Sequence, residues 1–486
     1  MKTITPAIVS SVSPETLDME TIPMDDQKCF KKLNDLDVFG IFQFETNVAK
    51  GVISEIGIDC FDDMYAATTL GRPDPLSGNL HVTYGRRKEG REHWESIPVV
   101  ADIMDRSFNL PIYQETSMIL ARRLAGFSGA EANALRKGLA KGKDNEDTMK
   151  KLQKMLADFK KRSQKSVEEG KISQEQLDEI VATLEKFGGY GFNLSHAVSY
   201  AMVAYWSLYL KTYFPVQFMV ALLNFTDLAK TDDKGGVVLK KYIQYARKLG
   251  VKITPPDVNT SEITFSLDDK VIRWGLGMVK GLGPKAAAEV LAKRPYDDFD
   301  DLLNKVEKRQ LNKTKVMALI KCGAFDNFGD REFLINYYLG SVRKEKGYEF
   351  IPFGDEERQK AEEELLGMSV SFGVMPDDLD YDKLSDYGVL RLGELENTME
   401  GVFLGKVGKI KKTNSKKSGK EMMIVEMCDD FDDMSFFVWE RDIDFCEKTL
   451  ITGHIMTVPL RKFEIDSDGC FYCGPQKDVL DLSEEE

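Results

Sequence analysis

The spacing of hydrophobic residues changes along the chain, from a helical repeat in the first part to an alternating repeat near the end. From residue 17 to about residue 230, apolar residues recur mostly at the three- and four-residue intervals of amphipathic helices. From Met399 onward the pattern alternates, which is typical of half-buried strands. The strands are expected at 401–410, 422–427, 434–439 and 455–460.

Capping signals define several of the expected helices. Ser128 and Glu131 form a capping box before the apolar-periodic residues 132–139. A long basic helix is expected over 150–169, ended by Gly170. The next helix opens with a second capping signal at 173–176. An aromatic helix follows Ser195 and stops at Pro215, and a Met/Leu-rich turn is expected from there to Thr226.

The Gly-rich segment at 185–200 carries the most informative chemistry. Asn193 or Ser195 can cap the aromatic helix, whose first turn would offer backbone N–H groups and the positive end of the helix dipole. His196 and Tyr200 are four residues apart and therefore share one helix face. An imidazole, a phenol ring and a helix N-terminus together suit a triphosphate that carries a base. The same residues also fit an ordinary cap, a satisfied histidine and core aromatics.

A second glycine motif lies in the middle of the chain. Gly281 and Gly283 precede Pro284 and an Ala-rich helix, which is the pattern of a helix–hairpin–helix. Glycines allow the hairpin backbone to touch a phosphate, and proline suits the first position of the second helix. A degenerate second copy is expected at 312–323. The alternative is a plain joint between two helices.

The four expected strands favour an OB-type barrel, with a basic loop between the first two. Such barrels bind single strands through stacking aromatics and a basic groove. Phe436, Phe437 and Trp439 are candidates for stacking, and the alternation indicates that at least one of them belongs to the barrel core.

Charge is distributed unevenly. The chain of 486 residues carries a net charge of −14, yet residues 135–172 hold 12 Lys/Arg against 6 Asp/Glu, and residues 405–420 hold seven Lys and no acid. Basic strips within an acidic protein can face phosphates, although each strip also fits a solvated surface. Seven scattered cysteines indicate a reducing compartment, and we expect Cys470 and Cys473 to be strand thiols rather than zinc ligands. The sequence predicts no membrane partner and a location in the cytoplasm of a bacterium or an infected host cell.

Six segments, in order, resemble those of one family. Residues 185–200 resemble the Tyr-Gly-Phe-Asn-x-Ser-His-Ala element of the bacterial replicative DNA polymerase III alpha subunits, the C family. The other five segments that resemble this family are 39–45, 71–75, 84–90, 112–118 and 135–141. The resemblance runs from about residue 17 to about residue 475.

This resemblance implies a multidomain chain with mainly α fingers, then a helix–hairpin–helix domain, then a small OB-type β-barrel. The expected parts are a tail or junction at 1–16, fingers at 17–230, tandem helix–hairpin–helix motifs at 231–345, a connector at 346–397, the barrel at 398–478 and an acidic tail at 479–486.

The family's palm domain grips Mg²⁺ with aspartates in a Pro-Asp-x-Asp-x-Asp-Phe element, and this sequence lacks that element. The acidic runs at 297–301 and 429–433 read as exposed turns instead. We therefore expect the C-terminal half of a split replicative polymerase from a phage or bacterium, inactive alone, with Mg²⁺ held by a palm on an N-terminal partner chain. The alternative is a non-catalytic DNA-binding accessory protein derived from such a polymerase.

The resemblance implies binding of deoxynucleoside triphosphates and primer–template DNA. The expected nucleotide contacts are Arg136, Lys137, Lys141, Asn193, His196 and Tyr200. The expected DNA contacts are Arg72, Arg86, Arg87, Lys88, Lys143, Gly281, Gly283, Lys285, Lys411, Lys412, Lys416 and Lys417. No catalytic or metal-binding residue is expected in this chain.

Two neighbouring features complete these expectations. We expect Gln114 and Glu115 to form hydrogen bonds within the fingers, in a structural role. A sliding clamp is a further candidate partner, although the corresponding segment, 348–353, has no clear glutamine.

Overall fold

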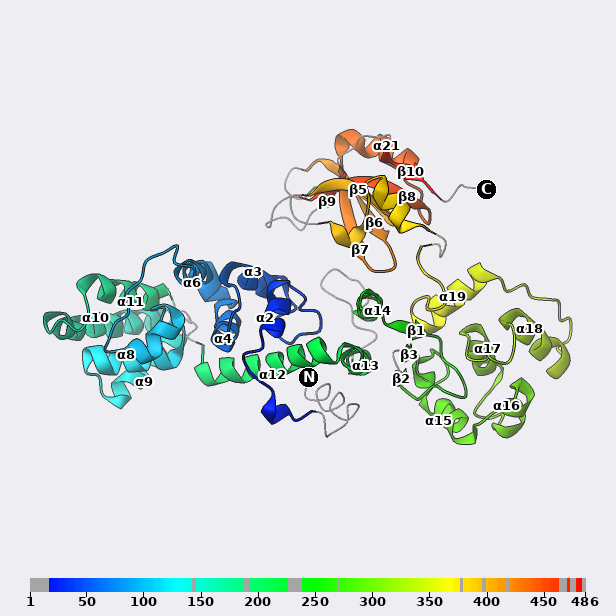
Figure 1. Cartoon of the computed structure of the whole chain (residues 1–486), viewed down its shortest axis with the longest axis horizontal. Coiled ribbons are helices and arrows are strands. Elements are labelled where there is room, and N and C mark those ends of the chain that lie inside the picture. The colour runs from blue at the N-terminus through cyan, green and yellow to red at the C-terminus, as the bar shows by residue number, and fades with distance from the viewer. Residues whose placement is uncertain are drawn as a thin grey trace. The chain divides into compact units, whose positions relative to one another are not determined.

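The chain forms two compact units, residues 1–218 and 219–486 (Figure 1). The computed structural model describes residues 17–141, 146–186, 192–225, 238–268, 271–375, 379–395, 399–415, 419–462, 470–472 and 478–482. Within these ranges, no helix combines the length and the apolar character needed to cross a membrane.

The first unit is built from helices. Its helices are α2 (Gln27–Asn34), α3 (Asn47–Ile56), α4 (Phe61–Leu70), α5 (Pro73–Ser77), α6 (Leu80–Lys88), α7 (Ala101–Met104), α8 (Gln114–Ala125), α9 (Gly129–Lys141), α10 (Glu146–Glu168), α11 (Gln174–Lys186) and α12 (Leu194–Tyr213), and α13 (Pro215–Phe225) continues into the second unit. The segment after Pro215 was expected to be a Met/Leu-rich turn, and that expectation is wrong. The residues of α13 are almost all apolar, so apolar and polar positions do not alternate with the helical period that would identify a helix. A sequence of this kind can still form a helix that is buried on most sides.

The predicted capping signals are confirmed. Ser128 accepts a hydrogen bond from the backbone N–H of Glu131, and the Glu131 carboxylate accepts one from the N–H of Ser128. Ser173 and Gln176 make the same reciprocal pair before α11. Gly170 follows α10 with a φ of +68°, a left-handed conformation that glycine adopts without strain.

Two groups of side chains hold this unit together. The apolar faces of α8, α9, α10 and α11 share one core, which contains Leu135, Phe159 and Leu177. Helix α12 packs against α2 and α4, and its Lys211 is buried. The Lys211 Nζ donates to the Asp37 carboxylate at 2.7 Å and to the carbonyl of Phe39 at 2.9 Å. These contacts fix the loop that precedes Phe42.

The second unit contains further helices and both β-sheets. Its helices are α14 (Val238–Lys248), α15 (Pro284–Lys293), α16 (Phe299–Lys305), α17 (Lys313–Lys321), α18 (Arg331–Asn336), α19 (Asp355–Leu366), α20 (Tyr381–Asp386) and α21 (Ile443–Thr449). Its strands are β1 (Lys252–Thr254), β2 (Ser266–Asp268), β3 (Val271–Arg273), β4 (Val389–Arg391), β5 (Glu400–Asn414), β6 (Glu421–Cys428), β7 (Asp433–Trp439), β8 (Ile455–Lys462), β9 (Cys470–Tyr472) and β10 (Leu480–Asp481).

Strands β4 to β10 form the expected OB-like β-domain. The four predicted strands correspond to β5, β6, β7 and β8. Long β5 pairs antiparallel with both β6 and β8, with an irregularity between Val407 and Ile410, so the sheet curls back on itself. The sheet also extends beyond the expected domain on both sides, because β4 pairs with β5 and β10 pairs with β8.

Candidate nucleotide and nucleic-acid interface

Arg136 is held by neutral oxygen atoms. Its Nη1 donates to Oε1 of Gln114 at 2.8 Å, and its Nε and Nη2 donate to Oδ1 of Asn133 at 3.1 and 3.0 Å. No carboxylate among the described residues forms an ion pair with this guanidinium. Its positive charge is therefore oriented but not neutralised by any described carboxylate, which suits a phosphate ligand. Lys137, the next residue on α9, is exposed, whereas the side chain of Lys141 and all of Lys143 lie outside the described residues.

The first turn of α12 is capped by side chains of its own unit. Asn193 Oδ1 accepts from the backbone N–H of His196 at 2.9 Å, so Asn193 rather than Ser195 is the cap. Glu115 accepts from the Asn193 amide at 2.6 Å and from the N–H of Leu194 at 2.8 Å. The expectation of free N–H groups at this helix start is therefore wrong for Leu194 and His196.

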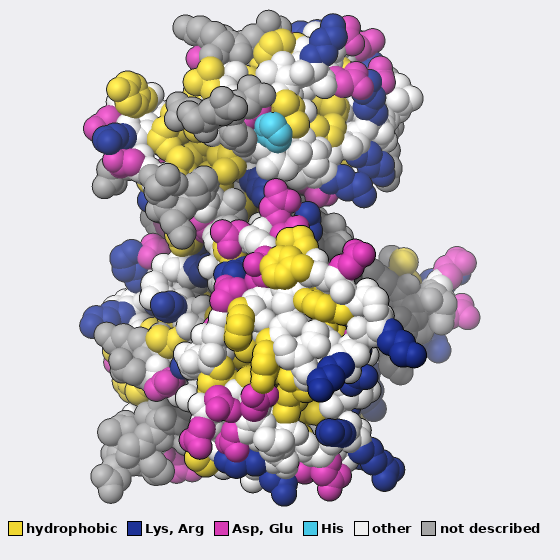
Figure 2. All heavy atoms as spheres, turned by 90° about the vertical axis from the view of Figure 1, so that its right-hand side faces the viewer, with side chains coloured by type: hydrophobic (Ala, Val, Ile, Leu, Met, Phe, Trp, Pro, Cys, Tyr) yellow, Lys and Arg dark blue, Asp and Glu magenta, His cyan; other side chains and the backbone are white. Residues whose placement is uncertain are grey.

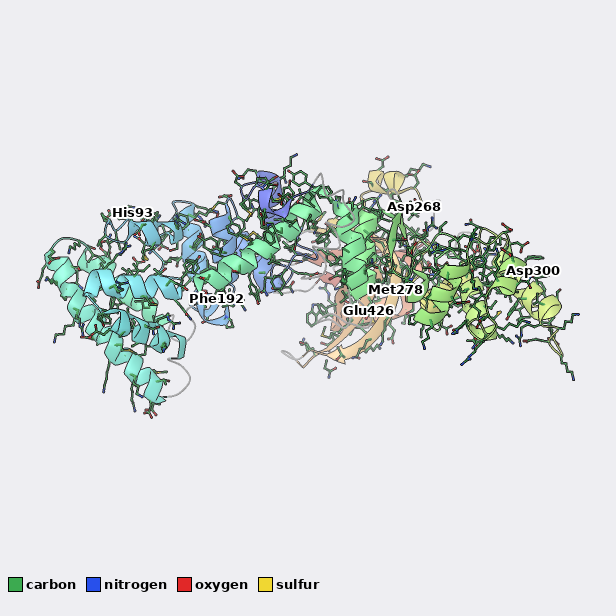
Figure 3. All side chains as sticks on the ribbon, turned by 90° about the horizontal axis from the view of Figure 1, so that it is seen from below. His93, Phe192, Asp268, Met278, Asp300 and Glu426 are labelled. Atoms are coloured by element: carbon green, nitrogen blue, oxygen red, sulfur yellow. The ribbon has the colours of Figure 1, made fainter. Side chains whose placement is uncertain are left out.

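An aromatic column runs along the start of α12. The rings of His196 and Tyr200 are 4.0 Å apart, and Phe192 and Phe42 lie at the two ends, 5.2 Å from His196 and 5.1 Å from Tyr200 (Figure 3 labels Phe192). The Arg72 guanidinium lies 4.8 Å from the centre of the Phe192 ring. His196 is exposed and Tyr200 is half-buried, so both are accessible to a ligand.

Two expected site residues meet in this column, and two members of it were not predicted. His196 and Tyr200 were expected to share a face, which the 4.0 Å separation confirms. Arg72, expected at DNA, lies over the Phe192 ring, and its contact with DNA stays a prediction. Phe42 and Phe192 were missed as members of this column, although both belong to the family-like segments 39–45 and 185–200.

The basic strip at the end of α6 serves mainly internal contacts. Arg86 is exposed, but Arg87 is buried and donates to Glu92 at 2.9 Å and to Glu179. Lys88 lies 2.9 Å from a carboxylate oxygen of Asp59 and 2.7 Å from one of Asp63. Burial alone would lower the pKa of Lys88, but these two acids raise it above its ordinary value. Arg87 and Lys88 were expected at DNA, and the structure gives both an internal role instead.

The first helix–hairpin–helix has the geometry that its glycines predict. Gly281 and Gly283 adopt φ values of +87° and +76°, and a Cβ at either would meet nothing within 4 Å. Pro284 begins α15, and Lys285 in its first turn is exposed. The hairpin backbone is thus open to an approaching phosphate.

The degenerate second copy differs. Gly323 also has a positive φ, +88°, but a Cβ there would collide with the Arg331 guanidinium. This glycine makes room for an internal arginine, so its backbone is not open in the same way.

The three aromatic residues of β7 that were candidates for stacking differ in their exposure to solvent. Phe436 is fully buried, Phe437 is half-buried and Trp439 is 39% exposed, which confirms that at least one belongs to the core. Lys411 and Lys412 lie exposed on β5, where Lys412 pairs with Glu447 at 2.6 Å. Lys416, Lys417 and Cys473 fall outside the described residues, as does the side chain of Cys470.

The acidic runs have local structural roles. Asp298 caps α16 by accepting from the N–H of Asp301, and Asp429 accepts from the N–H groups of Phe431 and Asp432 in the β6–β7 turn. Asp429 is 1% exposed, so it is not an exposed turn residue, and its burial raises its pKa. Across the described parts of the chain, no group of three or more His, Cys, Asp or Glu side chains is arranged to hold a metal ion.

Two family models and a set of curated relatives match this chain. The bacterial DNA polymerase III alpha subunit finger domain matches residues 3–163, and a helix–hairpin–helix motif matches residues 250–334. DNA polymerase III subunit alpha of Aquifex aeolicus is 31% identical over 427 residues, which cover 84% of this chain and 35% of the relative. The same subunit is 32% identical in Mycobacterium tuberculosis, over 70% of this chain and 29% of the relative. In Escherichia coli the same subunit is 30% identical, over 74% of this chain and 30% of the relative. The chain spans about a third of the length of these relatives.

Proposed function

The chain is of the bacterial DNA polymerase III alpha type, and we propose that it supplies the incoming-nucleotide and DNA contacts of a replicative DNA polymerase. In this proposal the palm domain that carries the chemistry lies on a separate polypeptide, because these 486 residues lack the Pro-Asp-x-Asp-x-Asp-Phe element. The reaction is template-directed transfer of a nucleotide from a deoxynucleoside triphosphate to a primer end.

The observation that carries the proposal is the arrangement around Arg136. A guanidinium held in place with no acid partner among the described residues is suited to the phosphates of a nucleotide. The column of His196 and Tyr200 offers flat rings on which a base or sugar can rest. Exposed Lys137 would add positive charge without the planar fork of an arginine.

Mg²⁺ belongs to the palm in this proposal. Two-metal phosphoryl transfer needs several carboxylates that converge on one point, and the described residues offer no such group. The chain's own residues therefore bind and orient the nucleotide, and no step of the chemistry is assigned to them.

DNA contacts are assigned to two places in the second unit. The open hairpin at Gly281 and Gly283, with Lys285 beside it, suits the backbone of a duplex. Trp439 and the lysines of β5 suit a single strand.

A sliding clamp remains the proposed partner of segment 348–353. Phe350 is 65% exposed and Ile351 is 40% exposed, and Phe333 on α18 is 62% exposed. Figure 2 views the molecule from the side where α17 and α18 lie in Figure 1, and it shows hydrophobic side chains gathered there with acidic ones beside them. An exposed apolar patch of this kind is typical of a protein contact.

Primer extension tests the proposal. The purified chain alone should not extend a primer, and adding a palm-bearing polypeptide of the DNA polymerase III alpha type should restore synthesis. In the reconstituted enzyme, Arg136→Ala should raise KM about equally for all four nucleotides, because phosphate contacts carry no base information. A lost charge-assisted contact of about 1.5–3 kcal/mol corresponds to roughly ten- to a hundredfold.

Three outcomes would contradict the proposal. Template-directed synthesis by the lone chain would remove the need for a palm elsewhere. An unchanged nucleotide KM in both Arg136→Ala and His196→Ala would place the nucleotide pocket elsewhere. DNA binding without any nucleotide dependence in the reconstituted mixture would favour the accessory-protein alternative.

A further inference from the structure

Two consecutive residues at the start of α8 connect both halves of the proposed nucleotide site. Gln114 reaches Arg136 on α9, with Oε1 2.8 Å from Nη1. Glu115 contacts the start of α12. One of its carboxylate oxygens accepts a hydrogen bond from the Asn193 amide, and the other accepts one from the backbone N–H of Leu194. The spacing between arginine and aromatic column is therefore set through adjacent side chains on one rigid helix.

The backbone reinforces this connection. Tyr113 and Phe192 form a parallel β-bridge, and the N–H of Gln114 donates to the carbonyl of Phe192 at 3.0 Å. The contacts of Glu115 then continue from Asn193 into α12, because the same Asn193 side chain accepts from the N–H of His196. A displacement of Glu115 would thus reach the His196 imidazole, whose ring lies 4.0 Å from that of Tyr200.

The chemical identity of Gln114 is as informative as its position. An amide oxygen holds a guanidinium in one orientation without cancelling its charge. A carboxylate would hold it more strongly, but it would also compete with a phosphate for the same N–H groups. Arg87, which pairs with Glu92 and Glu179, shows the opposite arrangement within the same unit.

We propose that Gln114 and Glu115 are positioning residues of the deoxynucleoside triphosphate site. Gln114 orients Arg136 while leaving its charge available to the triphosphate. Glu115 fixes the first turn of α12, and with it the place of His196 and Tyr200. This inference rests on the proposed function, and it gives a positioning role to two residues that were expected to be only structural.

Gln114→Glu is the decisive variant. It keeps an acceptor at the same place and strengthens the bond to Arg136, so the fold should be retained and the melting temperature should not fall. In the reconstituted enzyme we expect KM for every nucleotide to rise about ten- to a hundredfold with a smaller change in kcat, because the phosphate now competes with a carboxylate. A merely structural residue would show no such rise. Gln176→Glu, a substitution of the same kind in the cap of α11, is the matched control and should leave KM unchanged.

A double-mutant comparison separates the two hypotheses. In an Arg136→Ala background, Gln114→Glu should have little further effect on KM, because the residue through which it acts is gone. If Arg136→Ala raises KM but Gln114→Glu does not, the positioning inference is overturned and the proposed function survives. If Arg136→Ala leaves KM unchanged, the proposed function itself fails at this site.

The role of Glu115 can be tested on the 486-residue chain without a palm. Glu115→Ala removes the acceptor of the Leu194 N–H, and hydrogen exchange of the Leu194 and His196 amides should accelerate at least tenfold, with slower exchange partly regained in Glu115→Gln. Amides in the second half of α12 should keep their exchange rates. Unchanged exchange at both amides, or equal acceleration throughout α12, would overturn the assignment of Glu115.

Discussion

The Arg331 guanidinium donates to the Glu362 carboxylate at 2.9 Å, and Glu362 is fully buried. The other carboxylate oxygen accepts from the backbone N–H groups of Val370 and Ser371. Arg331 belongs to α18 and Glu362 to α19. The pair therefore links the end of the helix–hairpin–helix region to α19, which precedes the barrel in the sequence. Burial opposes the charge of Arg331, but its hydrogen bonds to the Asp326 carboxylate and its pairing with Glu362 raise its pKa.

Arg331→Met should strongly destabilise the second unit. The substitution leaves the Glu362 carboxylate buried without its cation, and breaking a buried pair in this way costs about 3–5 kcal/mol. Urea unfolding at 25 °C measures the loss, and Arg343→Met, which removes an exposed pair with Glu345 and a contact with the Tyr338 ring, should change stability by no more than about 1 kcal/mol. Adding Glu362→Met to Arg331→Met should recover part of the loss. Equal effects of the two arginine variants would contradict this account.

The buried Lys211 predicts a dependence of stability on pH. Burial lowers its pKa from 10.5 to about 8, although the nearby Asp37 carboxylate acts in the opposite direction. Between pH 8 and pH 10.5 the unfolded chain therefore binds more protons at this lysine than the folded chain does. The contribution of Lys211 to the free energy of unfolding should rise with pH across this window.

Comparison of the wild-type chain with Lys211→Met isolates this contribution. The difference in free energy of unfolding, wild type minus variant, should increase by roughly 2–3 kcal/mol from pH 7.5 to pH 10, at about 1.4 kcal/mol per pH unit. Lys31→Met is the control for the loss of a lysine, because Lys31 pairs with Asp35 at the surface, and it gives the baseline for the Lys211 difference. A flat difference for Lys211→Met would show that the lysine is not perturbed.

Much of the local structure was predictable because its causes are local. Ser128 and Glu131 lie three residues apart, and so do Ser173 and Gln176, so the sequence shows each pair directly. The alternation of apolar and polar residues within 401–439 likewise predicts β5, β6 and β7. One face of each of these strands is buried in the barrel, and a buried face of this kind produces the alternation.

Partners distant in sequence were not predictable from local patterns. Arg87 and Lys88 look like a phosphate-binding strip until Glu179 and Asp63 are brought beside them by the packing of other helices. For the same reason Glu115 gave no sign of its contact with Asn193, which caps a different helix. Charge on a helix face predicts binding only when the fold supplies no internal acid for it.

Lys285 should contribute to duplex binding. If its ammonium contacts a phosphate beside the Gly281–Gly283 hairpin, Lys285→Gln should weaken binding at low salt for all sequences alike. The slope of log affinity against log salt should become less steep by about 0.9. Lys293→Gln, at the far end of the same helix, is the control and should keep the wild-type slope. Fluorescence anisotropy with a labelled duplex measures the affinity and its salt dependence. Equal slopes for the wild type, Lys285→Gln and Lys293→Gln would exclude Lys285 from the interface.

Trp439 should contribute to single-strand binding by the barrel. Its ring is 39% exposed on β7, whereas Phe436 on the same strand is fully buried. A base stacked on an aromatic ring is worth about 1–3 kcal/mol, so Trp439→Leu should weaken binding of a single-stranded oligonucleotide roughly five- to a hundredfold with little change in melting temperature. Phe436→Leu should show the reverse pattern, because it removes buried volume and no exposed ring. Tyr387 is 85% exposed but lies outside the barrel strands, and Tyr387→Leu should leave single-strand affinity intact. If Trp439→Leu and Tyr387→Leu bind alike, the barrel does not stack bases at this position.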